Sequence, residues 1–298
     1  IRCYKTTGAK QAVVAHATSA SSVVSFKNWA VGGGGDCQFL VGHIKGVMEF
    51  DGIYAKDWAS EYLPLFRFDP ADASPPAWAM DTGSVLRIKR VYSVGTTPAI
   101  YRTVSTVGYS FDGLIEIENN TATGENFESS TLALFEFWSA SDLNTFGSSF
   151  QLRLRNNLST VAGKPQVKIP TGAGNDSRFQ IAANRFDSGW FQIGSTTYTS
   201  LAAFQAAHDA ARNNLDNDAK IAADGVPFPA SPLLSAGADL GYVEDIAGIK
   251  GRGFIGAFTR KRIGPIGNFA QARLAIIRQQ QLELLKKQLE EDSEHMDS

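Results

Sequence analysis

The chain has 298 residues and a formal net charge of −2 at pH 7, and charged residues make up only 19% of it. This near balance of charge argues against a protein that binds nucleic acid by neutralising phosphates, which requires a basic surface. Hydrophobic residues make up 43% of the chain, which is ample for a packed core and excludes global disorder.

Two cysteines, Cys3 and Cys37, exclude a disulfide-stapled scaffold and a zinc site built on cysteines. They could form one bridge or remain two reduced, buried thiols. The four histidines are too scattered for a metal site, and no cofactor is predicted. The chain has no apolar stretch of about 18 residues and no signal-peptide pattern at its start, so no membrane insertion is expected.

Most of the chain reads as short strands in which apolar and polar residues alternate. Such alternation over five or six residues is typical of a strand with one buried face. The strands predicted in this way are 23–28, 85–89, 114–118, 132–137 and 150–155. Helical periodicity is absent from the first 195 residues apart from a weak stretch at 54–62, so an all-β fold is predicted.

Several of these strands share one pattern: a strand is followed by a polar residue, usually asparagine, and some residues later by glycine. Such recurrence favours stacked strand-turn-strand coils. Asparagine fits the turns because it tolerates left-handed backbone and its amide can bond to the asparagine of the next coil. The alternative is that strands of many β proteins end in asparagine and glycine. The pattern occurs at 25–32, 88–95, 117–124, 154–163 and 181–189.

The longest interruption of the pattern lies at about 51–81 and is rich in aromatic residues and proline. A long loop of this composition on a rigid scaffold is often functional. Sealing of one flank of the coils by hydrophobic side chains is the alternative.

Residues 177–258 contain a series of short motifs in a fixed order. The series runs from Asn184 and Trp190 through Tyr198-Thr-Ser-Leu-Ala-Ala-Phe-Gln and Asn214-Leu-Asp-Asn-Asp-Ala to Ser231-Pro and Ala236-Gly, and ends in Asp245-Ile-Ala-Gly and Ile255-Gly-Ala-Phe. In this order the motifs resemble the last coils of right-handed parallel β-helix proteins of the pectate-lyase-like superfamily. One departure is that a proline expected after Asn214 is missing.

The resemblance implies an all-β, right-handed parallel β-helix (a solenoid) over residues 1–258, with coils between about 15 and 195. A closing helix and loops would occupy 196–258. In that closure Ser200 would cap a helix over 201–211 and Phe204 would pack on the coil beneath. These residues would cover the open end of the solenoid. The scaffold is similar in polysaccharide lyases, glycoside hydrolases and trimeric phage spikes, so the resemblance does not fix a function.

Three carboxylates are the candidate catalytic residues. If the coils stack in register, Glu116, Glu118 and Glu136 would lie on one face of neighbouring coils about 5–10 Å apart, because adjacent strands are about 4.8 Å apart. Such separations suit glycoside hydrolysis. The alternative is a ladder of salt bridges on an outward face.

Four further residues are candidates for contacts with a glycan. Arg153 and Arg155 share one face of the strand that follows, and Trp138 and Tyr92 could stack on sugar rings. The same face would then bind carbohydrate without cleaving it.

The composition changes beyond Phe258. A basic run and a Gly-Pro-Ile-Gly linker precede a helix predicted over 271–291, and the last residues are acidic. A short coiled-coil seam for self-association is predicted, although packing back on the coils or binding to another protein would use the same stripe. The seam residues are Ala275, Leu282, Leu285 and Leu289.

These features favour a component of a bacteriophage particle, of tailspike or tail-fibre type, that binds a cell-surface glycan. It would be a homotrimer or would dock on other virion proteins. The alternative is a secreted polysaccharide lyase or glycoside hydrolase of the β-helix type, and a bacterial adhesin is a third possibility.

Overall fold

The computed structural model describes part of the chain, all of it within the first of two compact units, Ile1–Arg260; the second unit, Lys261–Ser298, lies outside the described residues. The described residues are 13–32, 39–56, 65–68, 78–94, 100–103, 110–124, 133–137, 146–209, 211, 213–216, 219–220, 227, 230–238, 240, 243–244, 250–251 and 255–257.

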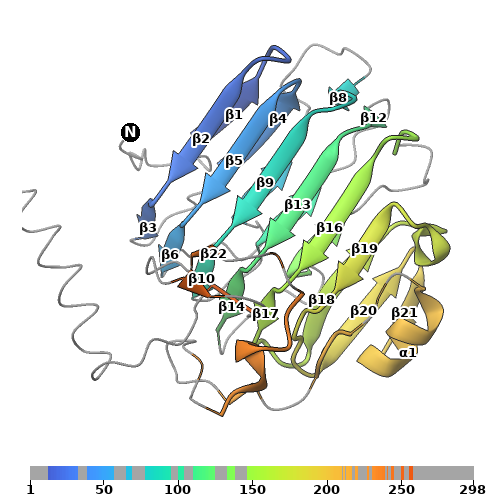
Figure 1. Ribbon diagram of the computed structural model, residues 1–298. Helices are drawn as coiled ribbons and strands as arrows, with labels where there is room; N and C mark the ends of the chain where they lie inside the picture. Colours follow the sequence, from blue (N-terminus) through green and yellow to red (C-terminus); the bar gives the residue numbers. More distant parts are fainter. Residues whose placement is uncertain are drawn as a thin grey trace, which may run out of the picture. The chain divides into compact units, whose positions relative to one another are not determined.

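The strands stack in parallel into three sheets, which we call sheets A, B and C (Figure 1). Sheet B contains β2 (Val23–Lys27), β5 (Val47–Asp51), β9 (Val85–Lys89), β13 (Leu114–Glu118), β16 (Gln151–Arg155) and β19 (Phe179–Ala182). Sheet C contains β3 (Ala30–Gly32), β6 (Tyr54–Lys56), β10 (Tyr92–Val94), β14 (Thr121–Thr123) and β17 (Leu158–Ser159). Sheet A contains β1 (Val13–Ala17), β4 (Phe39–Ile44), β7 (Phe66–Phe68), β8 (Trp78–Met80), β11 (Tyr101–Thr103), β12 (Ser110–Phe111), β15 (Phe135–Phe137), β18 (Lys164–Ile169), β20 (Gly189–Ile193) and the antiparallel β21 (Thr196–Tyr198).

Successive strands of the chain belong to sheets B, C and A in a repeating order. Examples are β9, β10 and β11, and then β13, β14 and β15. This mostly-β architecture of stacked parallel strands is consistent with a β-helix-like solenoid. The predicted strands at 85–89 and 114–118 are confirmed to the residue, and those at 23–28 and 150–155 to within one residue. The predicted strand at 132–137 is shorter and covers Phe135–Phe137.

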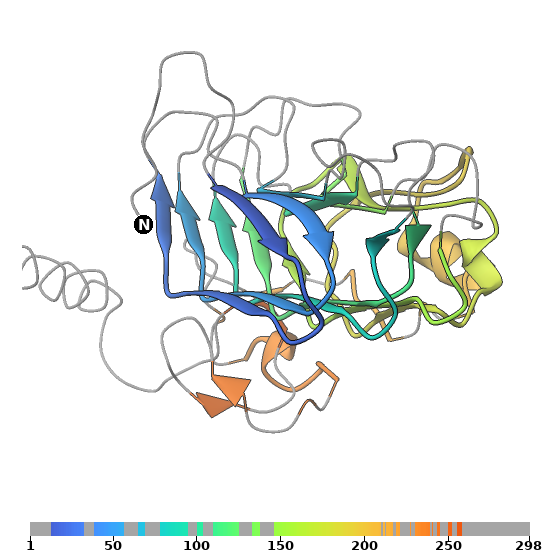
Figure 2. The same cartoon turned by 90° about the horizontal axis from the view of Figure 1, so that it is seen from above.

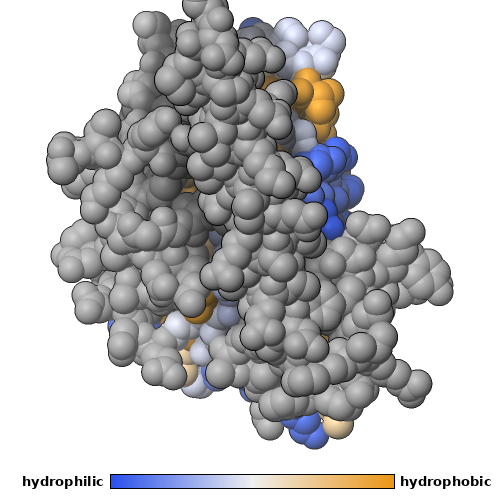
Figure 3. Space-filling view, turned by 90° about the vertical axis from the view of Figure 1, so that its left-hand side faces the viewer, coloured by the Kyte–Doolittle hydropathy of each residue, from blue (hydrophilic) through white to orange (hydrophobic). Residues whose placement is uncertain are grey.

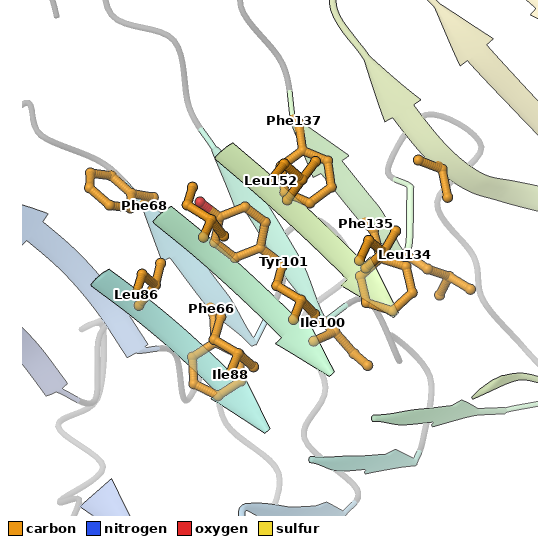
Figure 4. Packing of buried hydrophobic residues seen from close by; sticks show 14 of the residues in the cluster. Phe66, Phe68, Leu86, Ile88, Ile100, Tyr101, Leu134, Phe135, Phe137 and Leu152 are labelled. Atoms are coloured by element: carbon orange, nitrogen blue, oxygen red, sulfur yellow. The ribbon is translucent and has the colours of Figure 1, made fainter. Parts of the chain in front are cut away.

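Alternation along each strand divides the side chains between the core and the outside. In β9, Leu86 and Ile88 are buried in the core, whereas Arg87 and Lys89 point away from it. Aromatic side chains of β7, β11 and β15 lie in register, so that Phe66, Tyr101 and Phe135 follow one another through the core (Figure 4). The Tyr101 ring contacts that of Phe137 with centroids 5.2 Å apart, and the Phe66 ring stacks on that of Phe39 at 5.1 Å.

The corners between sheets B and C explain the recurring asparagine. The first corner residue is left-handed in successive coils, as at Asn119 (φ 54°) and Asn156 (φ 55°), and asparagine adopts this conformation at low cost. The second corner residue points inward and bonds to the next coil, as predicted. We call Asn120, Asn157, Asn184 and Asn214 the asparagine ladder.

The closing helix α1 (Leu201–Ala207) begins as predicted, since the Ser200 side chain accepts a hydrogen bond from the backbone N–H of Ala203. Phe204 stacks on Phe191 of β20 with ring centroids 4.6 Å apart. The prediction that the helix continues to residue 211 is wrong, because His208 is extended and the backbone N–H of Asp209 donates to Gly174.

The remaining closing segment, from Ser231 to Ala257, contains η4 (Pro232–Leu234), β22 (Val243–Glu244) and β23 (Lys250–Gly251). It lies outside the stack of strands, where it is drawn in orange in Figure 2. The Asn156 side chain bonds twice to the backbone of Ala238, and the backbone N–H of Ala257 donates to the Thr121 hydroxyl. The described residues of this segment therefore pack against sheet C and not on the end of the stack where they were predicted, whereas α1 packs on β20.

Candidate functional site

Glu116 and Glu118 point outward from β13 in sheet B, where each lies between cations of the neighbouring strands. Arg87 donates to Glu116 at 2.8 Å and Arg153 donates to it at 3.1 Å. Glu118 accepts hydrogen bonds from Arg155, one of them at 2.9 Å. Both carboxylates are therefore counter-ions in a ladder of salt bridges, which is the alternative that the sequence left open.

The electrostatics of Glu116 do not suit a general acid. Burial alone would raise the pKa of this carboxyl, but the hydrogen bond from Arg87 and the positive charges of Lys89, Arg87 and Arg153 outweigh it and hold the pKa below its ordinary value. A glycosidase acid requires a raised pKa, so that it carries a proton at neutral pH.

Glu136 does not join these two carboxylates, and the prediction that the three share one face is wrong. It points outward from β15, which belongs to sheet A, whereas Glu116 and Glu118 belong to sheet B. The reason is that the chain passes through sheet C and a long connection between β13 and β15, so residues one coil apart in sequence lie on different faces.

Around Glu136 the structure assembles a polar row that sequence reasoning missed. Residues at matching positions of β7, β11, β15, β18 and β20 lie side by side on the outer face of sheet A. The Nε atom of Arg102 is 3.2 Å from Glu136, and the Nζ atom of Lys168 is 3.9 Å from it. We call this set the sheet A row: Arg67, Arg102, Glu136, Lys168 and Gln192.

An aromatic side chain lies next to this row. The Nζ atom of Lys168 is 5.4 Å from the centre of the Trp190 ring, within the range of a cation–π contact. The sheet A row thus combines three cations, one carboxylate and an amide, and an indole lies next to it. This mixture of charged, hydrogen-bonding and aromatic groups suits a polar ligand with ring faces, such as a sugar chain.

The sheet A row also lies where the chain departs most from a regular repeat. Sheets B and C are joined by corners of two residues, as at 90–91 and 119–120. Both ends of the central strands of sheet A are instead attached to long connections, and long connections on a rigid scaffold often carry binding residues. These connections are 57–65 and 69–77 around β7, 95–100 and 104–109 around β11, and 124–134 and 138–150 around β15.

A signal for the sheet A row was present in the sequence. Phe66-Arg-Phe68, Tyr101-Arg-Thr103 and Phe135-Glu-Phe137 each place one charged residue between two residues that face the core. The runs at 66–68 and 101–103 are too short to show alternation over five or six residues, whereas Phe135–Phe137 lies within the predicted strand 132–137.

The other predicted glycan contacts have different outcomes. Arg153 and Arg155 lie on sheet B as counter-ions of Glu116 and Glu118. The structure does not support a sugar-stacking Tyr92, because its ring is buried, stacks on Tyr54 at 5.2 Å and packs with the cluster that contains Ala257.

Some predictions fall on residues outside the described ones: Trp138, the cysteines Cys3 and Cys37, and the seam residues Ala275, Leu282, Leu285 and Leu289. Within the described ranges, no three histidine, cysteine or acidic side chains gather closely enough to hold a metal ion. Nor does any described helix have the length and apolar character needed to cross a membrane.

Fold and site together define a mostly-β protein of stacked parallel strands with a mixed polar and aromatic row on one outer face. No family model matches the chain, and no curated protein and no solved structure matches it either. Its function is therefore inferred from the arrangement of its own residues.

Proposed function

We propose that the chain is a right-handed parallel β-helix that binds a cell-surface glycan on the sheet A row. In this proposal it serves as a spike- or fibre-type component of a phage particle, as a homotrimer or docked on other virion proteins. The observation that carries the proposal is the sheet A row itself, in which Arg102 and Lys168 lie on either side of Glu136 and Trp190 lies next to Lys168. The carboxylates of sheet B support binding over hydrolysis, because both serve as counter-ions.

The proposal is tested with an array of bacterial cell-surface polysaccharides, followed by calorimetric titration of each one that binds. We expect Arg102→Ala to weaken binding about 10- to 100-fold, since a hydrogen bond from a charged group contributes about 1.5–3 kcal/mol. The matched control is Arg153→Ala on sheet B, because both arginines pair with one glutamate and their side chains are 35% and 33% exposed.

Two results would contradict glycan binding at this row. One is that the unmodified protein binds none of the polysaccharides. The other is that Arg102→Ala and Arg153→Ala weaken binding equally, which would point to a general effect of lost charge.

A second function, cleavage of an acidic polysaccharide by β-elimination, is favoured by one observation on the same row. Burial lowers the pKa of Lys168, and the charge of Arg102 lowers it further, whereas the carboxylate of Glu136 opposes the shift. A lysine with a lowered pKa gives up its proton more readily, and once deprotonated its amine can accept the proton next to a sugar carboxylate, while a nearby guanidinium can neutralise that carboxylate. The proton on the carbon next to the carboxylate would pass to the amine, the bond from the adjacent carbon to the glycosidic oxygen would break, and a double bond would form between the two carbons. The leaving sugar would keep that oxygen and take up a proton from water.

If this reaction occurs, Lys168→Met should abolish the ultraviolet absorbance of the unsaturated product, measured with polygalacturonate and alginate as substrates. Glu118→Gln on sheet B should leave the rate unchanged and serves as the control. Cleavage that survives Lys168→Met, or that is lost with Glu118→Gln, would exclude this assignment.

A further inference from the structure

The outer face of sheet B carries a feature that the proposed glycan site does not use. The first residue of each of its first four strands is apolar and points outward. Val23 is 71% exposed, and Val47, Val85 and Leu114 are partly exposed. They pair in register from β2 to β13, and so form a continuous apolar stripe, which Gln151 of β16 ends.

The stripe lies on an open face. Figure 1 looks onto sheet B, and no other described strand or helix crosses its central strands. At the right-hand edge of Figure 3, which corresponds to the front of Figure 1, hydrophobic surface lies next to strongly hydrophilic surface. The closing segment lies at the other end of the strands, beyond their last residues (Figure 1).

Beside the stripe, charges alternate along the stack. In one row Glu49, Arg87, Glu116 and Arg153 follow one another in register, with signs −, +, −, +. In the next row the order is Asp51, Lys89, Glu118 and Arg155, again with signs −, +, −, +. If the same row of a second copy lies against the first in the reverse order, every charge therefore faces a charge of the opposite sign.

This symmetry makes the face complementary to itself in one orientation. A two-fold axis parallel to the strands, between β9 and β13, would place Arg87 opposite Glu116 of a second copy, and Val85 opposite Leu114 of that copy. A two-fold axis along the stack would instead place each residue of the central charged row opposite itself, and like charges would meet. Isologous interfaces require such self-complementarity, and like-charge contacts suppress the wrong arrangement.

We propose that sheet B is the contact surface for a second copy of this chain, and that the two stacks run antiparallel. The apolar contact is made by Val85 and Leu114 of the stripe, on either side of the axis, and the charged rows set its orientation. The ion pairs within each chain already satisfy the carboxylates, so the charges select the register and the stripe supplies the affinity.

The size of the face indicates a weak, reversible pair. Six strands about 4.8 Å apart, each about 16 Å long, give a flat area of roughly 400 Å². A standard interface buries about 800 Å² on each partner. Association in the micromolar range or weaker is therefore expected.

Sedimentation velocity of the full chain over a range of concentrations tests the proposal. We expect a reversible increase in mass that Leu114→Lys weakens at least 10-fold and that Val85→Lys weakens similarly. Thr197→Lys, at an exposed position of sheet A, is the matched control and should not change the association. Leu285→Lys disrupts the predicted seam of the C-terminal helix. The increase in mass that depends on Leu114 should persist in this variant, which distinguishes association through sheet B from association through that helix.

The orientation is tested by zero-length carbodiimide cross-linking of an equal mixture of ¹⁴N- and ¹⁵N-labelled chains. We expect mixed-isotope products that join Lys89 of one copy to Glu118 of the other. The proposal is overturned if the protein stays monomeric at all concentrations, if Leu114→Lys leaves association unchanged, or if mixed-isotope products lack this link. Glycan binding on sheet A is a separate property and survives any of these results.

Discussion

Replacing Asn157 with alanine is expected to lower the free energy of unfolding by about 3–5 kcal/mol, because buried polar groups left without a partner cost about 1–3 kcal/mol each. The Asn157 side chain accepts hydrogen bonds from the backbone and side-chain amides of Asn120 and donates to Ile117 and Asn184. Asn120, Asn157 and Asn184 are 0% exposed, so water does not replace these bonds in the native state.

Urea denaturation followed by tryptophan fluorescence and circular dichroism measures the loss. Asn157→Asp should be at least as harmful, because it buries a charge and turns the donor toward Asn184 into a second acceptor. The control is Asn175→Ala at an exposed position, which should change stability by less than about 0.5 kcal/mol. A cost below about 1 kcal/mol for Asn157→Ala would show that the asparagine ladder contributes little to stability.

Acidification from pH 7 to pH 4 is expected to remove about 3 kcal/mol of stability through His208 alone. This histidine caps the end of α1 and is 0% exposed. Burial lowers its pKa to about 4 from the ordinary 6.5, against the raising effect of Asp209 and Asp176. Because the unfolded chain binds the proton more tightly, the stabilisation is complete above pH 6.5 and is lost as the pH falls through 4.

Urea denaturation at pH 7, 6, 5 and 4 tests this expectation. In His208→Gln the fall in stability over this range should be smaller than in the unmodified protein by about 3 kcal/mol. His16→Gln, at an exposed histidine, is the control and should keep the original pH dependence. An unchanged slope in His208→Gln would assign the acid sensitivity to other groups.

The two variants test different parts of one end of the molecule. The asparagine ladder runs from Asn120 to Asn214, which follows α1 in the chain, so it connects the coils to the closing region. His208 is the residue that ends α1 in this closing region. Loss of Asn157 should destabilise the protein at every pH, whereas replacement of His208 should change its stability most strongly below its ordinary pKa.

The sequence by itself determined the features that depend on a few neighbouring residues. In 85–89 and 114–118, apolar residues alternate with polar ones because every second side chain faces the core. These strands were therefore predicted to the residue. The bond between asparagines of neighbouring coils and the cap by Ser200 were predicted correctly, because these side chains bond to the backbone or to the equivalent residue of the next coil.

Only the tertiary structure decided which outward residues share a face. Glu116 and Glu136 are both charged residues on outward strand positions, yet they belong to sheets B and A because the lengths of the connections set where each strand falls. Tyr92 is buried by Ala257, far away in the chain, and no local pattern records that contact. The sheet A row depends on register between five strands, which is fixed by long-range packing and not by any stretch of sequence.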